Sequence, residues 1–236
     1  MRTVYVNGEF IAEQDAKVSI FDRAFLFADG VYEVTSVLNG RLVDFDNHIK
    51  RLKRSMKELN FGPKINEEEL LAFHRKLVDL NEIKEGIIYL QVSRGIAERD
   101  FAFPNSKTEL TITAFTQKKD LIDNPSAHNG ISIITIDDLR WKRCDIKTIQ
   151  LLYPSMAKTE AMKQGADDAW MVQNGYVMEG SSNNAWIIKG QNIYTREADN
   201  LILKGITREA VINVAKQLNY KVTAKQFTVT EAENAD

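Results

Sequence analysis

Three short segments of the chain place reactive side chains next to backbone features that suit ligand binding. Residues 143–148 carry Lys147 among charged neighbours, just ahead of an expected helix. Residues 179–184 form a small polar loop that begins with a carboxylate, Glu179. Residues 203–208 open another expected helix with a glycine, and the free N–H groups at such a helix start can hold a phosphate.

Each segment also has a purely structural explanation. A lysine at the start of a helix is usually solvated, a run of Gly, Ser and Asn is typical of hairpin loops, and a glycine before a helix often serves only the turn. Together, however, the three segments supply one consistent chemistry: a lysine that forms a Schiff base, an acid that pairs with a pyridinium nitrogen, and a cup for a phosphate group. We therefore treat them as one candidate site.

The composition is that of an ordinary globular protein. Of the 236 residues, 44% are hydrophobic and 27% charged, and 31 Lys and Arg against 33 Asp and Glu leave a net charge of -2. Without a basic excess, we expect neither nucleic acid nor a membrane surface as a partner. The single cysteine, Cys144, excludes an internal disulfide and a cysteine-based zinc cluster, and the three histidines stand at no ligand spacing. No apolar segment resembles a signal peptide or a bilayer span, which predicts a cytoplasmic protein.

The first half of the chain predicts a small α/β domain. Asn-Gly pairs at positions 7–8 and 39–40 lie between alternating apolar residues and so predict two hairpins. Asp46 is the expected N-cap of a helix, and a second helix begins with an acidic turn. In chain order, we expect hairpins at 4–11 and 31–45, helices at 46–60 and 66–80, and strands at 87–94 and 110–117.

A change in composition separates the second half. Residues 119–130 are polar and lack an apolar period, which indicates a linker between domains 1–118 and 131–236. In the larger second domain we expect a buried strand at 131–136, a helix at 149–163 with Pro154 in its first turn, hairpins at 170–178 and 185–194, a helix at 205–218 and a strand at 221–229.

The fold class follows from these elements. Asn-Gly hairpins favour antiparallel or mixed sheets over a doubly wound parallel one. Neither a GxGxxG motif nor a P-loop occurs, which argues against the common dinucleotide-binding and nucleoside-triphosphate folds. We expect a two-domain α/β protein with mixed or antiparallel sheets and flanking helices.

Six blocks of sequence resemble, in the same order and at the same spacing, the fold-type IV pyridoxal-phosphate aminotransferases, and among them those that act on D-amino acids. The blocks span the whole chain: FDRAF with DGVYEV at 21–34, NHIKRL at 47–52, QVSRG at 91–95, LRWKRCDIK at 139–147, EGSSN at 179–183 and LKGITR at 203–208.

The resemblance implies pyridoxal 5'-phosphate as cofactor. Lys147 takes the position of the lysine that forms the Schiff base and later moves a proton between Cα and the cofactor, two tasks that suit an amine whose pKa is lowered by burial. Glu179 matches the acid that pairs with the pyridine nitrogen and keeps the ring an electron sink. Arg51 matches the arginine that binds the phosphate, with a solvated charge on its helix as the structural alternative.

The resemblance also implies contacts of lesser weight around the cofactor. The N–H groups of Ile206 and Thr207 match the phosphate site at the helix start. Leu203 matches a side chain packed against the ring, although a plain core leucine explains it equally well. Ser182 matches a residue that supports the site from further out.

For the substrate carboxylate, Tyr32 and Arg99 match the family's binding positions, with Arg99 reaching in from the partner subunit. This implies a homodimer with shared active sites, whereas the structural alternative for Arg99 is an exposed loop residue. The family has a histidine two residues after this arginine, where the chain has Phe101, so one hydrogen-bond donor is missing. The family also continues for several tens of residues beyond the position of Asp236, including a Ser/Thr loop at the phosphate, so we expect the second domain to be truncated.

We predict transamination between a D-amino acid such as D-alanine and a 2-oxo acid. Three alternatives stay open. An aminodeoxychorismate lyase-like enzyme would keep the lysine and the glutamate but eliminate pyruvate; the block around Lys147 and the presence of Arg99 favour the transaminase. A branched-chain aminotransferase carries a different motif around its lysine. The third alternative is a non-catalytic scaffold, which stays open because the family's larger domain has further strands beyond the position of Asp236.

Overall fold

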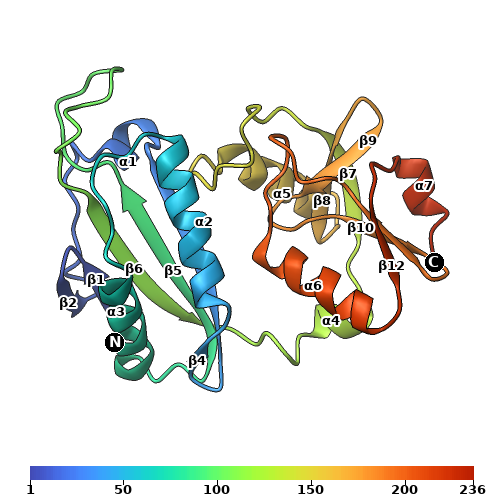
Figure 1. Ribbon diagram of the computed structural model, residues 1–236, viewed down its shortest axis with the longest axis horizontal. Coiled ribbons are helices and arrows are strands. Elements are labelled where there is room, and N and C mark those ends of the chain that lie inside the picture. The colour runs from blue at the N-terminus through green and yellow to red at the C-terminus, as the bar shows by residue number, and fades with distance from the viewer. The chain divides into compact units, whose positions relative to one another are not determined.

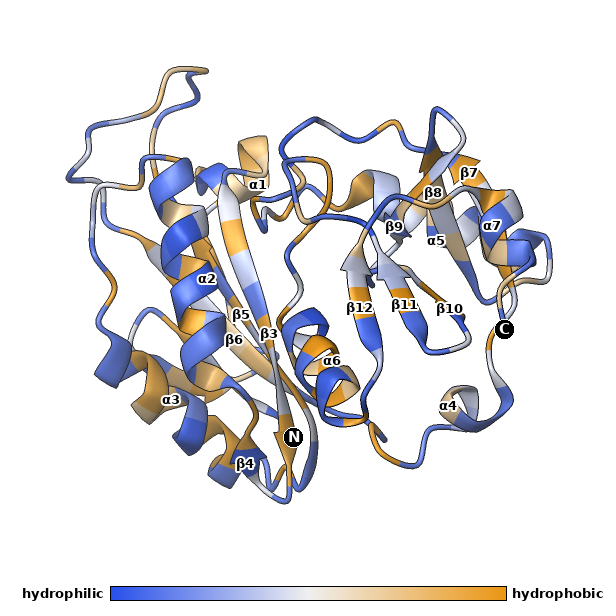
Figure 2. Cartoon of the chain, turned by 45° about the vertical axis from the view of Figure 1, so that its right-hand side comes forward, coloured by the Kyte–Doolittle hydropathy of each residue, from blue (hydrophilic) through white to orange (hydrophobic).

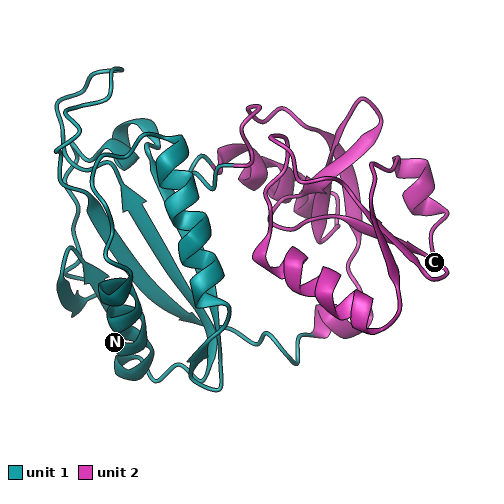
Figure 3. Ribbon diagram, in the orientation of Figure 1, with its two compact units in different colours: residues 1–124, 146–150 teal, residues 125–145, 151–236 magenta.

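The computed structural model describes residues 1–236, and the chain divides into two compact units (Figure 3). Unit 1 comprises Met1–Asn124 and Ile146–Gln150, and unit 2 comprises Pro125–Asp145 and Leu151–Asp236. The expected linker at 119–130 includes a short helix, α4 (Pro125–Asn129), with which unit 2 begins. That residues 1–118 and 131–236 form separate domains stays a prediction.

Unit 1 is built on a six-stranded antiparallel sheet with the strand order β2-β1-β6-β5-β3-β4 (Figure 1). Both predicted Asn-Gly hairpins form, because Asn7, Gly8, Asn39 and Gly40 all take the positive φ that a tight two-residue turn needs. The strands are β1 (Thr3–Val6), β2 (Glu9–Ala12), β3 (Gly30–Leu38), β4 (Arg41–Leu42), β5 (Glu85–Ser93) and β6 (Thr111–Lys118).

Two long helices, α2 (Phe45–Glu58) and α3 (Glu67–Leu80), cover one face of this sheet (Figure 1). Hydrophobic and hydrophilic residues alternate around α3 (Figure 2), so that its apolar side faces the sheet. The core between them is formed by alternate residues of the strands and by helix residues spaced three and four apart. Its buried members include Val31, Val37, Ile88, Leu90, Val92, Ile49, Leu52, Leu70 and Leu77.

The starts of the two helices differ from each other. The second helix, α3, begins one residue later than predicted, because Asn66 is its N-cap: its side chain accepts hydrogen bonds from the N–H groups of Glu68 and Glu69. The predicted N-cap at Asp46 is wrong. Because β4 ends at Leu42 and the chain turns in a left-handed conformation at Asp44, α2 already begins at Phe45 and Asp46 lies in its first turn.

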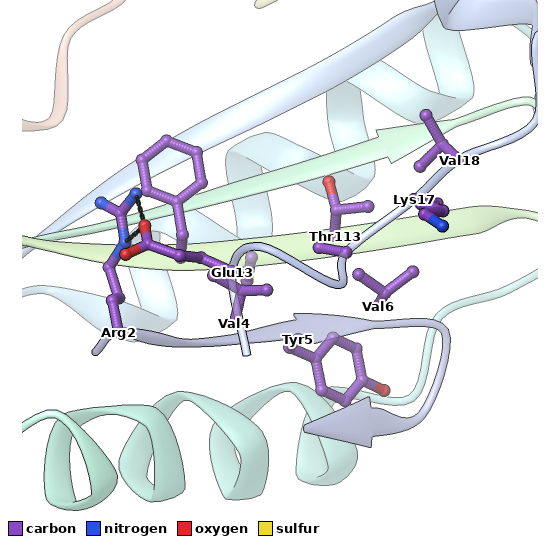
Figure 4. Close-up of a pocket in the computed structure, with 11 residues that line it drawn as sticks. Arg2, Val4, Tyr5, Val6, Glu13, Lys17, Val18 and Thr113 are labelled. Atoms are coloured by element: carbon purple, nitrogen blue, oxygen red, sulfur yellow. Dashed lines mark hydrogen bonds and ion pairs between the residues drawn. The ribbon is translucent and has the colours of Figure 1, made fainter. Parts of the chain in front are cut away.

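On the opposite face of the sheet, aromatic rings stack across neighbouring strands. The ring of Tyr89 lies between those of Tyr32 and Phe115, with centroids 5.5 and 5.0 Å away. Near Phe115, residues of β1 and β6 and the segment after β2 line a shallow pocket of about 280 Å³, where Arg2 pairs with Glu13 (Figure 4). None of the predicted site residues lines this pocket.

Unit 2 contains two mixed three-stranded sheets, ordered β7-β8-β9 and β10-β11-β12. In each sheet the parallel pair is joined by a helix, as parallel strands require: α5 (Leu152–Lys163) between β7 and β8, and α6 (Ile206–Gln217) between β11 and β12. The strands are β7 (Ile133–Asp137), β8 (Asp168–Gln173), β9 (Tyr176–Gly180), β10 (Trp186–Lys189), β11 (Asn192–Thr195) and β12 (Lys221–Ala224). The expected α/β class with mixed sheets is therefore confirmed.

Several expected boundaries in unit 2 are wrong. The strand expected to be buried, β7, lies at the edge of its sheet, and Ile133 is 37% exposed. The last strand ends at Ala224, because Thr228 forms a capping box that starts a short helix, α7 (Val229–Glu233). The helix expected from residue 149 begins at Leu152, with Pro154 in its first turn as predicted. No helix of the protein combines the length and apolar character of a membrane span.

Candidate active site

Lys147 lies in an extended segment, Ile146–Gln150, that pairs with the start of β3 in unit 1. The N–H of Tyr32 donates to the Lys147 carbonyl at 3.0 Å, and the N–H of Ile149 donates to the Gly30 carbonyl at 3.1 Å. Gly30 permits this approach, because a Cβ there would meet the Ile149 side chain at 2.9 Å. Ile146 is 3% exposed and belongs to the core of unit 1. The apolar position between the charged residues of this motif therefore anchors the lysine.

The amine of Lys147 is half-buried and lies over an aromatic ring. Its Nζ is 4.2 Å from the ring centroid of Tyr32, a distance typical of a cation–π contact. The Lys147 N–H donates to the Ser55 hydroxyl at 3.2 Å, which ties the segment to α2. Tyr32 and Lys147 are thus two separately predicted site residues that the structure brings together.

Arg51 makes a two-point ion pair with a buried carboxylate. Its Nε lies 2.8 Å from Glu33 Oε1 and its Nη2 lies 2.7 Å from Glu33 Oε2. His48 Nδ1 is 2.7 Å from the same Oε2, and the Glu33 side chain is only 1% exposed. Burial acts to raise the pKa of Glu33, but hydrogen bonds from Arg51 and His48 outweigh it and hold that pKa below its ordinary value. The guanidinium of Arg51 is therefore held in a buried ion pair and is not a solvated charge.

Sequence reasoning missed Glu33 and His48. A signal was present for Glu33: it falls in the register of Val31 and Val37, on the apolar face of β3. A carboxylate buried at such a position needs a hydrogen-bonding or positively charged partner, and Arg51 of α2 is that partner. His48 stands next to Ile49 on the buried side of α2.

In unit 2, Glu179 is 5% exposed and accepts hydrogen bonds on both oxygens. Arg140 Nη1 donates to Oε1 at 2.5 Å, Asn184 Nδ2 donates to Oε2 at 3.0 Å, and the Leu203 N–H lies 3.2 Å from Oε2. Arg140 is itself held by Asp138 through its Nε and Nη2, at 2.9 and 2.7 Å. Burial raises the pKa of Glu179, and the charge of Arg140 works against that rise.

Arg140 and Asn184 were also missed as functional residues. Both lie within or next to the sequence blocks noted above: Arg140 is in the block that ends at Lys147, and Asn184 directly follows the block at 179–183. Their types gave no separate signal, because an arginine before a loop and an asparagine in a hairpin are common.

The start of α6 offers backbone N–H groups for an anion. Gly205 is its N-cap and has no side chain to cap the first turn, which contains Ile206 and Thr207. A Cβ at Gly205 would come within 2.4 Å of Asn184 Oδ1, so a side chain there would displace the Asn184 amide. Arg208, in the same turn, is 8% exposed and its buried Nε has no hydrogen-bond partner.

Two further predicted residues flank this region. Leu203 is half-buried, and its carbonyl accepts a hydrogen bond from Asn184 Nδ2 at 2.9 Å. Ser182 is exposed on the loop between β9 and β10.

Arg99 lies in unit 1, on the connection between β5 and β6, and is exposed. Its guanidinium carbon is 5.4 Å from the ring centroid of Phe27 and 5.5 Å from that of Phe101. Phe101 is itself 80% exposed. The predicted set thus divides between the units: Tyr32, Arg51, Arg99 and Lys147 in unit 1, and Glu179, Ser182, Leu203, Ile206 and Thr207 in unit 2.

Comparison with known proteins is consistent with this geometry. A family model described as amino-transferase class IV matches residues 30–236. D-alanine aminotransferase from Staphylococcus aureus (strain MSSA476) is 42% identical over 238 residues, covering 100% of this chain and 83% of the relative. The D-alanine aminotransferase from Bacillus licheniformis is 39% identical, covering 99% of this chain and 82% of the relative.

Solved structures share the fold. A branched-chain aminotransferase from Thermoproteus uzoniensis with norvaline has a TM-score of 0.85 at 25% identity, covering 100% of this chain and 81% of that one. A putative 4-amino-4-deoxychorismate lyase from Legionella pneumophila has a TM-score of 0.83 at 25% identity, covering 95% and 82%. With a family model over most of its length and relatives at about 40% identity, this chain belongs to the class IV aminotransferases.

Proposed function

We propose that the chain transfers an amino group between a D-amino acid, D-alanine in particular, and a 2-oxo acid, with pyridoxal 5'-phosphate as cofactor. The observation that carries the proposal is Lys147, a primary amine at the family's lysine position, fixed by backbone pairing to β3 and held over Tyr32. The identity of 42% with a D-alanine aminotransferase, against 25% with branched-chain and lyase structures, supports the choice of substrate.

The residues present fit this cofactor. Lys147 supplies an amine, Glu179 a buried carboxylate with donors on both oxygens, and the start of α6 an uncapped turn beside the buried guanidinium of Arg208. When bound, pyridoxal phosphate supplies an aldehyde that takes up the amino group and a ring that accepts electrons released at the substrate Cα.

We assign the chain's own residues as follows. Lys147 holds the cofactor and moves the proton at the substrate Cα. Glu179 accepts a hydrogen bond from the protonated pyridine nitrogen, and the ion pair with Arg140 favours the ionised carboxylate that this task requires.

The phosphate would be bound by the N–H groups of Ile206 and Thr207, with Arg51 adding positive charge. Leu203 would pack against the ring, and Ser182 would support the loop beside it.

For the substrate carboxylate we assign Tyr32 and Arg99. Arg99 is exposed on its loop beside Phe101, which suits a residue that reaches into the site of a second copy, so we propose a homodimer. Phe101 cannot donate a hydrogen bond, and carboxylate binding therefore depends on a guanidinium and a phenol.

The experiment that tests the reaction type is a stoichiometric assay. We incubate the chain with pyridoxal phosphate, D-alanine and 2-oxoglutarate and measure pyruvate and glutamate together. A transaminase yields one glutamate for each pyruvate. A non-catalytic scaffold yields neither product from D-alanine. In a parallel reaction, a lyase given its own amino substrate in place of D-alanine yields pyruvate without consuming the 2-oxo acid; either result would refute the proposal.

A further inference from the structure

Two segments that carry none of the assigned site residues, 21–30 and 91–95, meet at one buried carboxylate in unit 1. Asp29 Oδ2 accepts from Arg23 Nε at 2.7 Å and from Arg94 Nε at 2.8 Å. The side chains of Asp29, Arg23 and Arg94 are 7%, 3% and 6% exposed. A single carboxylate therefore holds two buried guanidinium groups.

The first of these arginines reaches the loop that carries Arg99. Arg23 Nη1 donates to the carbonyl of Asp100 at 2.8 Å, and the Arg23 N–H donates to the carbonyl of Gly95 at 2.9 Å. Its guanidinium carbon lies 4.5 Å from the ring centroid of Phe27, the ring that Arg99 and Phe101 also contact. Arg23 thus holds the backbone of the residue directly after Arg99.

The second arginine holds the far side of the same loop. The guanidinium carbon of Arg94 lies 3.8 Å from the ring centroid of Phe103 and 4.4 Å from that of Phe61. Its Nη1 and Nη2 donate to the carbonyls of Asn60 and Leu59, at 3.1 and 2.7 Å. Arg94 therefore links residues 96–104, through the ring of Phe103, to the residues that directly follow α2.

This arrangement is more elaborate than stability requires. Burying two guanidinium groups on one carboxylate carries a desolvation cost, and apolar residues of similar size often stabilise a fold as well. What an ion network adds is a single geometry, because a planar guanidinium satisfies its acceptors in one orientation only. The carboxylate also directly precedes β3, the strand that carries Tyr32.

We propose that Asp29, Arg23 and Arg94 are positioning residues that set the place of Arg99 relative to its own unit. They act through residues 96–104, whose outer side chains Arg99, Phe101 and Phe103 are largely exposed and cannot fix the loop by burial. The inference rests on the proposed function, which gives Arg99 the substrate carboxylate. A guanidinium held in advance binds a carboxylate without the entropy cost of ordering its loop.

The variant Arg23→Lys tests this inference. A lysine retains the charge beside Asp29 but cannot bridge from that carboxylate to the Asp100 carbonyl in the fork geometry of an arginine. We expect KM for D-alanine to rise by about five- to tenfold with kcat little changed, as loss of a single positioning hydrogen bond would give. We also expect amide exchange of residues 96–104 to accelerate by about tenfold while β3 and β5 remain protected.

Two further variants make the test specific. Phe103→Leu, at a side chain that is 54% exposed, removes the ring over Arg94 and leaves the buried ion pairs untouched. Phe103→Leu is expected to raise KM for D-alanine by about threefold. If Arg23→Lys does not fold, this variant alone tests the positioning role. Asn66→Ala, which removes the N-cap of α3 in the same unit, is the stability control and should change neither KM nor exchange of the loop.

The double variant with Arg99→Ala separates the two levels of the proposal. If Arg23 acts through Arg99, Arg23→Lys adds nothing to the KM of Arg99→Ala. Should Arg99→Ala raise KM while Arg23→Lys and Phe103→Leu leave both KM and exchange unchanged, the positioning role is refuted and the proposed function stands. Should Arg99→Ala itself leave KM unchanged, the carboxylate role of Arg99 is refuted and the positioning inference with it.

Discussion

Glu179 and Arg140 form an ion pair in the interior of unit 2, with 2.5 Å between Glu179 Oε1 and Arg140 Nη1. The pair is not isolated, because the Nε and Nη2 of the same guanidinium donate hydrogen bonds to Asp138. Burial raises the pKa of Glu179, and the charge of Arg140 opposes that rise and so favours the ionised carboxylate. The charge state of Glu179 therefore depends on a residue that the sequence motifs do not single out.

Replacing Arg140 by methionine should move the acid limb of the activity profile. In the role proposed for Glu179 the carboxylate must be ionised, so activity falls as pH drops through its pKa. Without Arg140 that pKa rises further, so the fall occurs at a higher pH. The measurement is the pH dependence of kcat. Arg140→Lys retains the charge and should shift the limb by less; an unchanged limb in Arg140→Met would contradict the role of the pair.

Lys147→Ala should abolish transamination, by roughly a thousandfold or more, and leave the fold intact. The fold survives because the segment is anchored by its backbone pairing with β3 and by Ile146, not by the lysine side chain. Lys147→Arg should be equally inactive, since arginine stays protonated and cannot act as a nucleophile.

The control for Lys147 is Lys142→Ala, which removes an exposed lysine from the same block and should keep full activity. Borohydride reduction with pyridoxal phosphate, followed by peptide mass mapping, should label Lys147 in the wild type. Label on another lysine, or turnover by Lys147→Ala, would show that the assignment is wrong.

Arg51→Ala should destabilise unit 1 because it leaves the Glu33 carboxylate buried without its arginine. Removing one partner of a buried pair costs about 3–5 kcal/mol. Adding Glu33→Gln removes the charge as well, so the double variant should recover most of this loss. All three tryptophans, Trp141, Trp170 and Trp186, lie in unit 2, so tryptophan fluorescence does not monitor the unfolding of unit 1. The stability of unit 1 is therefore measured by amide exchange of β3. Equal stability of the single and double variants would contradict this coupling.

The buried His74 predicts an acid weakness of unit 1. Burial lowers its pKa from 6.5 to about 4, although its Nδ1 lies 2.6 Å from the Leu70 carbonyl. Between these pH values the unfolded chain binds a proton that the folded chain excludes. Unit 1 should therefore lose about 3 kcal/mol of stability as pH falls across this window.

The test for His74 compares amide exchange of α3 near pH 7 and near pH 4.5. His74→Phe keeps the ring that stacks on Phe73 and should remove most of the pH dependence. His128→Gln, at an exposed histidine of α4, should leave it unchanged. A wild type whose α3 is equally protected at both pH values would contradict the prediction.

Much of the fold could be predicted from local patterns. The Asn-Gly hairpins, the acidic first turn of α3 and the apolar face of α2 are set by residues close together in the chain. The prediction errors arise where the structure is determined by contacts between residues that are distant in the chain. The segment around Lys147 belongs to unit 1 because its backbone pairs with β3, which lies more than a hundred residues earlier.

The sequence blocks nominate candidate site residues one by one, but they do not indicate the contacts that support them. Lys147, Glu179 and the Gly205 turn stand out through their sequence blocks. Arg140 and Glu33 have no local signal of comparable strength, since their importance arises from ion pairs that close across 39 and 18 residues. Only the folded chain shows which charges are buried together.

The most direct test of the proposed activity is the ratio of kcat/KM for D-alanine to that for L-alanine and L-leucine, measured with 2-oxoglutarate and added pyridoxal phosphate. We expect D-alanine to be preferred by about a hundredfold or more, the discrimination that a site built for one enantiomer provides. Turnover confined to L-leucine and other branched L-amino acids would show that the chain is a class IV aminotransferase of the other specificity and would contradict the proposal.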